Sequence, residues 1–292
     1  MNFVSFAELT RDVRGLSAQL PSDIRAVVGI PRSGVVAAGM FALHRNIPLL
    51  SIAQLADPTL PTSGRTSGNP RIPVQYDGPV LVLDDTYNTG RTFACVVEEL
   101  ATCPHPLTYA AVYRAEQDAP IHTYRRIRQP RVFEWNVFHS QFMPVTVFDM
   151  DGVLCENPRQ KEGDSGIELD VFLHHLEHAK PLHVPTVPIL AIATGRLEKY
   201  KSQTEAWLKK HGVKYQILQM SPHKTAASRR AANDSGRMKA AVYKALLQSP
   251  LFIESSARQA ADIYRLTQRP VLCSDTMTMV SDPFHGGNIH DE

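Results

Sequence analysis

Short apolar runs rich in Val, Ile and Leu alternate along this chain with longer segments of helical period, and this alternation constrains the fold more than any other feature. In the first half, strands are expected at 26–30, 48–52, 80–83 and 107–113. Helices are expected at 35–44 and 92–101. Strands that alternate with helices in this way favour a mostly parallel sheet covered by helices. The first half is therefore predicted to form an α/β domain.

The second half repeats the same pattern. Strands are expected there at 145–148, 189–192, 215–218, 251–253 and 271–273. Helices are expected at about 169–178, 198–211, 238–247 and 256–266. A chain of 292 residues is long enough for two domains of ordinary size. We expect two Rossmann-like domains, residues 1–142 and 143–292.

The composition is that of an ordinary soluble protein, with 43% hydrophobic and 21% charged residues. A formal net charge of +2 gives no reason to expect nucleic-acid binding. The apolar runs are shorter than a membrane span, and the N-terminus lacks the order of a signal peptide. The cysteines have no zinc-binding spacing, so free thiols and a cytoplasmic location are expected.

The segment 124–131 is locally basic, with four arginines in seven positions, 125 to 131. A solvated face is one interpretation. An anionic substrate, a membrane surface or the other domain are the alternatives.

The strand at 80–83 is followed by two acids and a loop of small polar residues that opens a helix. The acids are Asp84 and Asp85, and the loop and helix start comprise Asn88, Thr89, Gly90, Arg91 and Thr92. Carboxylates at the end of a parallel strand can accept hydrogen bonds from a vicinal diol, and N–H groups at a helix start can bind a phosphate. These parts suit a ribose 5-phosphate.

An earlier turn, 29–34, lies in the same strand–loop–helix context and contains Arg32, Ser33 and Gly34. Together, these two motifs resemble the phosphoribosyl pyrophosphate (PRPP) motif and the pyrophosphate loop of the type I phosphoribosyltransferases, over about residues 20–140. The resemblance implies PRPP as substrate and Mg²⁺ on its pyrophosphate. Tyr87 and Asn88 depart from the family pattern, which predicts a differently shaped 5-phosphate loop.

Other features of the first half leave the acceptor open. The loop 53–73 occupies the place of the family's flexible lid, with Arg65 or Arg71 as pyrophosphate contacts. The aromatic segment 133–135 is either a hood that stacks on a nucleobase or part of a domain interface. The candidates for a general base that activates a hydroxyl acceptor are Asp57, Asp77 and Glu134.

The strand at 145–148 is followed by Asp149, Met150, Asp151 and Gly152. A carboxylate at the strand end can attack phosphorus, and a second acid two residues later can protonate the leaving oxygen and then activate water. This segment resembles motif one of the haloacid dehalogenase-like hydrolases. The resemblance implies that Thr194 holds the phosphoryl group.

The same resemblance implies a motif-three cation, with Lys239 preferred over Lys224 and Lys244. It also implies that Asp149, the backbone carbonyl of Asp151 and Glu254 bind Mg²⁺, a cation that prefers oxygen ligands. Ser255 departs from the family, which often has a second acid there. The short spacing between motifs leaves no room for a large cap domain, so a capless fold with an open site is expected.

Over its whole length the chain resembles fused phosphoribosyltransferase–phosphatase proteins of bacterial polysaccharide clusters. The resemblance implies transfer of 5-phosphoribose from PRPP to a glycan hydroxyl and then removal of the 5-phosphate, which leaves a β-ribofuranosyl residue. It implies a glycan or lipid-linked glycan acceptor, contact with the inner face of the membrane if the acceptor is lipid-linked, and no nucleic acid. A homo-oligomer is a further expectation. A nucleobase phosphoribosyltransferase coupled to a nucleotide phosphatase is one alternative, and a PRPP sensor fused to a phosphatase is another.

Overall fold

The computed structural model describes residues 1–57, 77–115, 118–159 and 163–280. The chain divides into two compact units, Asn2–Trp135 and Asn136–Glu292, which we call the N-terminal and C-terminal units. The sequence places the boundary slightly later, at 142/143. In the structure, the ring of Phe138 stacks 3.8 Å from that of His183, and Val137 is buried. These contacts keep segment 136–142 with the C-terminal unit.

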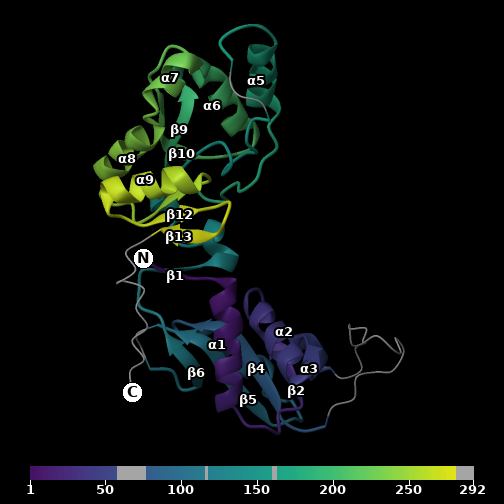
Figure 1. Ribbon diagram of the computed structural model, residues 1–292. Coiled ribbons are helices and arrows are strands. Elements are labelled where there is room, and N and C mark those ends of the chain that lie inside the picture. The colour runs from purple at the N-terminus through teal and green to yellow at the C-terminus, as the bar shows by residue number, and fades with distance from the viewer. Residues whose placement is uncertain (58–76, 116–117, 160–162, 281–292) are drawn as a thin grey trace. The chain divides into compact units, whose positions relative to one another are not determined.

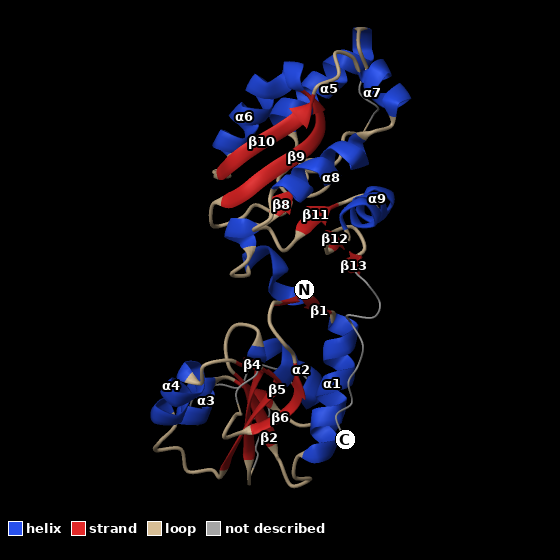
Figure 2. Ribbon diagram, turned by 90° about the vertical axis from the view of Figure 1, so that its left-hand side faces the viewer, coloured by secondary structure: helices blue, strands red, loops and turns tan. Residues whose placement is uncertain are grey.

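The N-terminal unit is built on a parallel sheet with the strand order β3-β2-β4-β5-β6. Its strands are β2 (Ala26–Gly29), β3 (Leu49–Leu50), β4 (Val80–Tyr87), β5 (Leu107–Arg114) and β6 (His122–Arg126). Helices α1 (Phe6–Gln19) and α2 (Gly34–Arg45) cover one face, whereas α3 (Ile52–Ala56) and α4 (Arg91–Glu99) cover the other (Figure 2). In the view of Figure 1, α1 crosses in front of the sheet. The predicted α/β architecture of the first half is confirmed.

Several elements of this unit have no counterpart in the sequence predictions. The pair β1 (Asn2–Val4) and β7 (Arg131–Phe133) forms a small parallel sheet. Helix α1 begins with a capping box in which Ser5 and Glu8 exchange hydrogen bonds, a motif that marks helix starts. The predicted loop 53–73 is also partly wrong, because α3 occupies its first residues; residues 58–73, with Arg65 and Arg71, lie outside the described residues.

The C-terminal unit has a second sheet with the order β10-β9-β8-β11-β12-β13, parallel except for its last pair. Its strands are β8 (Val147–Phe148), β9 (Ile189–Leu197), β10 (Tyr215–Ser221), β11 (Phe252–Glu254), β12 (Val271–Cys273) and β13 (Thr278–Val280). Strand β13 follows the predicted end of regular structure at Thr276, so part of the expected irregular tail is a strand. Residues 281–292 lie outside the described residues.

The helices of the C-terminal unit are α5 (Gly166–His178), α6 (Lys201–Lys210), α7 (Ala226–Ala232), α8 (Ser235–Ala245) and α9 (Ala257–Thr267). Helices α8 and α9 pack on one face of the sheet, and α5 and α6 lie on the opposite side (Figure 2). Between β8 and β9 the described residues contain one helix, α5. The second half is therefore also an α/β unit around a mostly parallel sheet.

Candidate active sites

The carboxyl ends of three neighbouring strands, β9, β8 and β11, meet at one edge of the C-terminal sheet. Asp149 follows β8 directly, and its backbone N–H donates to the oxygen of Ile253, 2.9 Å away. Thr194 lies in β9 and Glu254 ends β11. All three side chains are buried. Parallel topology thus brings Asp149 and Glu254 to one sheet edge, although they are 105 positions apart in the sequence.

Lys239, on α8, lies between two of these carboxylates. Its Nζ is 2.8 Å from Oδ2 of Asp149 and 2.6 Å from Oε2 of Glu254, and its side chain is only 2% exposed. The two rival lysines, Lys224 and Lys244, are exposed. Of the three candidates, Lys239 is therefore the one in contact with Asp149.

The electrostatics of this group are set by burial and by excess negative charge. Burial and the neighbouring Glu254 raise the pKa of Asp149, while Lys239 opposes the shift. Burial acts to lower the pKa of Lys239, but the two carboxylates raise it overall. One ammonium thus faces two buried carboxylates. When both carboxylates are ionised, the three side chains carry a net negative charge that a further cation could neutralise.

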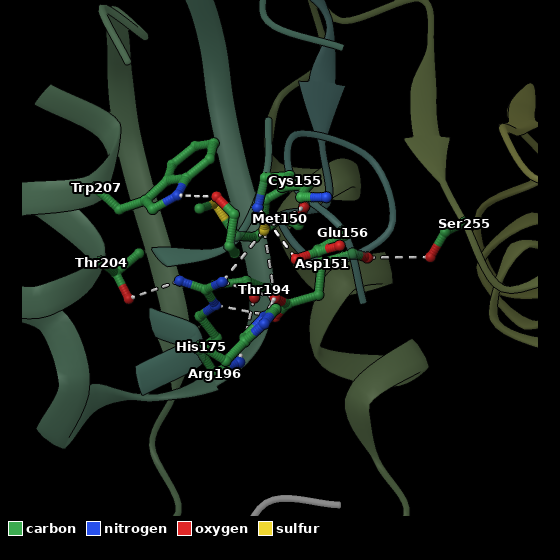
Figure 3. Close-up of polar contacts among 12 residues, drawn as sticks. Met150, Asp151, Cys155, Glu156, His175, Thr194, Arg196, Thr204, Trp207 and Ser255 are labelled. Carbon is green, nitrogen blue, oxygen red and sulfur yellow. Dashed lines mark hydrogen bonds and ion pairs between the residues drawn. The ribbon is translucent and has the colours of Figure 1, made fainter. Parts of the chain in front are cut away.

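The carboxylate of Asp151 is clamped by Arg196 (Figure 3). Nε of Arg196 donates to Oδ2 at 2.9 Å and Nη2 donates to Oδ1 at 2.6 Å, while Nε2 of His175 lies 3.1 Å from Oδ1. Burial alone would raise the pKa of Asp151, but Arg196 and His175 lower it overall. Asp151 is therefore ionised in this arrangement. The sequence patterns pointed to neither Arg196 nor His175 as its partner.

Asp151, Cys155 and His175 also form a cluster in which three potential metal ligands lie close together. Nη2 of Arg196 contacts both Asp151 and the Sγ atom of Cys155, the latter at 3.3 Å. Burial, followed by the charge of Asp151, also raises the pKa of the Cys155 thiol, whereas a metal would require the thiolate. A guanidinium thus already supplies the positive charge, so the cluster does not fit a metal ion.

The predicted Mg²⁺ ligands fit a hard cation better. Asp149, Glu254 and the carbonyl of Asp151 offer only oxygen atoms. Burial and then the charge of Glu254 raise the pKa of Asp149, and a dication would offset both effects. Oγ of Ser255 donates to the Asp151 carbonyl at 3.1 Å and fixes its direction (Figure 3). Ser255 thus orients one of the predicted ligands.

In the N-terminal unit, Asp84 and Asp85 lie within β4 rather than after it, because the strand continues to Tyr87. Strand β2 pairs with β4 only as far as Gly29 opposite Leu83, so the two acids lie just beyond the end of β2. Both side chains are buried, and Oδ1 of Asp84 accepts the N–H of Asp85 at 2.8 Å. The two acids thus lie on the part of β4 that extends beyond the end of β2.

The turn 29–34 packs against the first of these acids. A Cβ atom at Gly34 would lie 2.7 Å from Oδ1 of Asp84 and 2.9 Å from the backbone oxygen of Leu83, so only glycine fits. The N–H of Ile30 donates to that same oxygen at 2.9 Å. Arg32 is exposed and Ser33 is half-buried, so both side chains are open to an anion beside Asp84.

The second predicted loop leads into α4. Gly90 has a φ of 77°, a conformation that glycine adopts without strain, and it is the residue that precedes the helix. The side chain of Tyr87 packs against Phe93, with ring centroids 5.6 Å apart, and fills the space beside Gly90. The remaining predicted phosphate contacts are exposed: Asn88, Thr89, Arg91 and Thr92. The loop thus presents polar side chains and the start of α4 to solvent.

The aromatic segment 133–135 has structural roles. The rings of Phe133 and Trp135 stack 4.9 Å apart, and Nε1 of Trp135 donates to Oδ2 of Asp85 at 2.7 Å. Oε2 of Glu134 accepts the N–H of Phe6 at 2.7 Å. Trp135 therefore positions an acid of the candidate site. Glu134, a candidate general base, already accepts a backbone hydrogen bond.

Two arginines of the basic segment 124–131 form contacts within the N-terminal unit. Arg125 forms ion pairs with Glu8 and Asp12 on α1, and Arg131 is buried and donates to the oxygen of Ile127. Only two of the four arginines, Arg126 and Arg128, are exposed, so the interpretation of the cluster as one solvated or membrane-facing surface is corrected. In the part of the chain that the structure describes, no helix has the length and apolar character needed to span a bilayer.

Replacing Asp84 with Asn is expected to stabilise the protein at pH 8. Burial and the charge of Asp85 raise the pKa of Asp84 to about 8, so the folded protein keeps a proton that the unfolded chain releases near pH 4. Wild-type stability is then lost as pH rises between these values, and the Asn variant escapes that loss, which is about 4 kcal/mol between pH 5 and pH 8. Thermal unfolding at pH 5 and pH 8 measures the difference. Exposed Asp23→Asn is the control, and a stabilisation that does not grow with pH would contradict the expectation.

Comparisons with known proteins concern the first half of the chain. No family model and no curated protein matches the chain. A purine phosphoribosyltransferase from Pyrococcus horikoshii is 21% identical, with a TM-score of 0.34, and the match covers 46% of this chain and 94% of that one. A xanthine-guanine-hypoxanthine phosphoribosyltransferase from Helicobacter pylori is 16% identical, with a TM-score of 0.34 and coverage of 47% and 93%. At these values the likeness assigns no activity.

Proposed function

We propose that the chain is a bifunctional enzyme that transfers 5-phosphoribose from PRPP to a glycan hydroxyl and then hydrolyses the 5-phosphate. The observation that carries the phosphatase half is the buried group of Asp149, Lys239 and Glu254 at the ends of parallel strands. The transferase half is supported by Asp84 and Asp85 beside the 29–34 turn. Each unit thus contributes one phosphate-handling site.

In the proposed phosphatase reaction, Asp149 attacks phosphorus and the leaving ribose oxygen takes a proton. The ammonium of Lys239 neutralises charge on the phosphoryl oxygens, and the hydroxyl of Thr194 donates a hydrogen bond to one of them. Asp149, Glu254 and the Asp151 carbonyl would hold Mg²⁺, which supplies Lewis-acid stabilisation of the phosphoryl charge. The aspartyl-phosphate is then hydrolysed by water.

Asp151 is the proposed acid and base of the two steps. Its contacts with Arg196 and His175 keep it ionised, which suits the second step, in which it takes a proton from water. The first step requires Asp151 to be protonated. We therefore propose that the phosphate group of the substrate draws Arg196 away from Asp151, which raises the pKa of Asp151 for the first step.

In the proposed transferase reaction, the paired acids bind the ribose diol of PRPP. The high pKa of Asp84 leaves it protonated near neutral pH, so that it donates to one hydroxyl, while Asp85 is oriented by Trp135 and accepts from the other. The polar loop 88–92 receives the 5-phosphate, and the turn at Arg32 receives the pyrophosphate. The glycan hydroxyl attacks C1 with inversion, the bond from C1 to pyrophosphate breaks and pyrophosphate leaves. The proton of the hydroxyl passes to water or to one of the candidate general bases, Asp57, Asp77 or Glu134.

The two proposed activities can act one after the other on the same molecule. Transfer produces a 5-phosphate monoester, which is the substrate class that the second site is proposed to hydrolyse. A lipid-linked acceptor, contact with the inner face of the membrane and a homo-oligomer stay predictions.

The test follows pyrophosphate release from PRPP and Mg²⁺ with a panel of nucleobases and synthetic glycans, and then phosphate release. Glycan-dependent pyrophosphate release, lost in Asp85→Asn, followed by phosphate release from the product, is the expected result. Turnover with nucleobases alone would replace the glycan proposal with the nucleotide pathway. PRPP binding without pyrophosphate release for any acceptor would favour a sensor.

A further inference from the structure

A basic pocket of about 410 Å³ lies among α7, α8 and α9 of the C-terminal unit. Its charged lining consists of five arginines and one acid: Arg229, Arg230, Arg237, Arg258, Arg265 and Asp262. Arg229 is half-buried, whereas the other four arginines are exposed. No step of the proposed reactions uses this pocket.

The pocket adjoins the phosphatase site through two elements. A Cβ atom at Gly195 would lie only 3.2 Å from Nη1 of Arg229, and Gly195 directly follows Thr194, which is proposed to hold the phosphoryl group. The first turn of α8 lines the pocket, and the next turn carries Lys239 to Asp149. The pocket therefore lies directly beside Thr194 and Lys239, the residues proposed to contact the phosphoryl group.

Contacts within the protein offset part of the positive charge, and Arg229 and Arg230 have interactions of their own. Asp262 forms an ion pair with Arg265 at 3.1 Å, and Arg258 donates to the neutral oxygen of Asn233 at 2.6 Å. Among the described residues, none forms a hydrogen bond or ion pair with the guanidinium of Arg237. The N-termini of α8 and α9 add partial positive charge on the same side. The pocket thus favours an anion.

We propose that this arginine pocket is a subsite for a second anionic group of the phosphatase substrate, a carboxylate or a phosphate beyond the ester that is hydrolysed. The planar fork of arginine matches both groups. This inference rests on the proposed phosphatase function and narrows its substrate class: the glycan that carries the 5-phosphoribose is acidic rather than neutral. The second anion lies in the arginine pocket while the 5-phosphate faces Asp149.

The test compares three phosphatase substrates with the full-length protein. The first is methyl β-ribofuranoside 5-phosphate, which has no second anion; the others link the same ribofuranoside to a uronic acid or to a sugar phosphate. We expect wild type to prefer one or both linked substrates by about tenfold or more in kcat/KM, and Arg237→Gln and Arg258→Gln to remove most of that preference. Which linked substrate is preferred identifies the anion as carboxylate or phosphate.

Exposed Arg126→Gln, in the other unit, is the matched control and should keep the preference of wild type. The inference is overturned if wild type hydrolyses all three substrates equally, or if both pocket variants retain the wild-type ratio. Failure of wild type to hydrolyse any of the three substrates would instead overturn the proposed function, and the subsite with it. Thermal unfolding of each variant verifies that it is folded.

Discussion

Replacing Asp149 with Asn is expected to lower the phosphatase kcat by at least about a thousandfold, because an amide lacks the nucleophilic oxygen that attacks phosphorus. Asn has nearly the same shape, and Lys239 keeps its contact with Glu254 at 2.6 Å, so the unit should remain folded. Phosphate release from a ribofuranoside 5-phosphate measures the loss. In the coupled reaction, the phosphorylated transfer product should accumulate.

Asp151→Asn is the matched comparison, since it alters the second acid of the same motif but leaves the nucleophile. This variant is expected to be slow in both steps and still able to form the aspartyl-phosphate, which intact-protein mass measurement after rapid quenching detects. Asp149→Asn should give no such adduct. Phosphate release by Asp149→Asn within tenfold of wild type would show that another group attacks phosphorus.

Much of this site could be predicted from local sequence. Asp149 and Glu254 each stand at the end of a short apolar run, and parallel strands end at a common edge. The sequence offers Lys239 together with two rival lysines. Gly236, Lys239, Ala240 and Tyr243 are all buried and share one face of α8, whereas Lys244 points away. Because Lys244 is one helical turn after buried Ala240, helical spacing alone does not separate the two lysines, and the packing of α8 decides between them.

The partners of Asp151 could not be predicted in this way. Arg196 is 45 residues away and His175 is 24 residues away, on α5, whose position depends on packing against α6 and the end of β9. The same limit applies to Glu134, which looks like a free acid near the predicted acceptor site. Its hydrogen bond to Phe6 depends on the pairing of β1 with β7, two three-residue strands with no distinct pattern.

Replacing Lys239 with Met is expected to destabilise the C-terminal unit by about 3–5 kcal/mol at pH 8, because it leaves two buried carboxylates without their cation. The remaining repulsion should raise the pKa of Asp149 further. The folded state then binds protons that the unfolded chain has released, so stability is lost as pH rises and regained as pH falls toward 5. Denaturation by urea at both pH values, followed by Trp207 fluorescence in a Trp135→Phe background, measures the effect in this unit.

Two further variants separate charge from packing. Lys244→Met alters an exposed lysine on the same helix and should change stability little. Adding Glu254→Gln to Lys239→Met removes one of the two stranded carboxylates and should restore part of the lost stability at pH 8, without restoring phosphatase activity. If Lys239→Met unfolds at the same urea concentration as Lys244→Met at pH 8, the lysine does not neutralise the buried acids. The buried carboxylates of Asp149 and Glu254 would then not carry the excess negative charge on which the proposed phosphatase site depends.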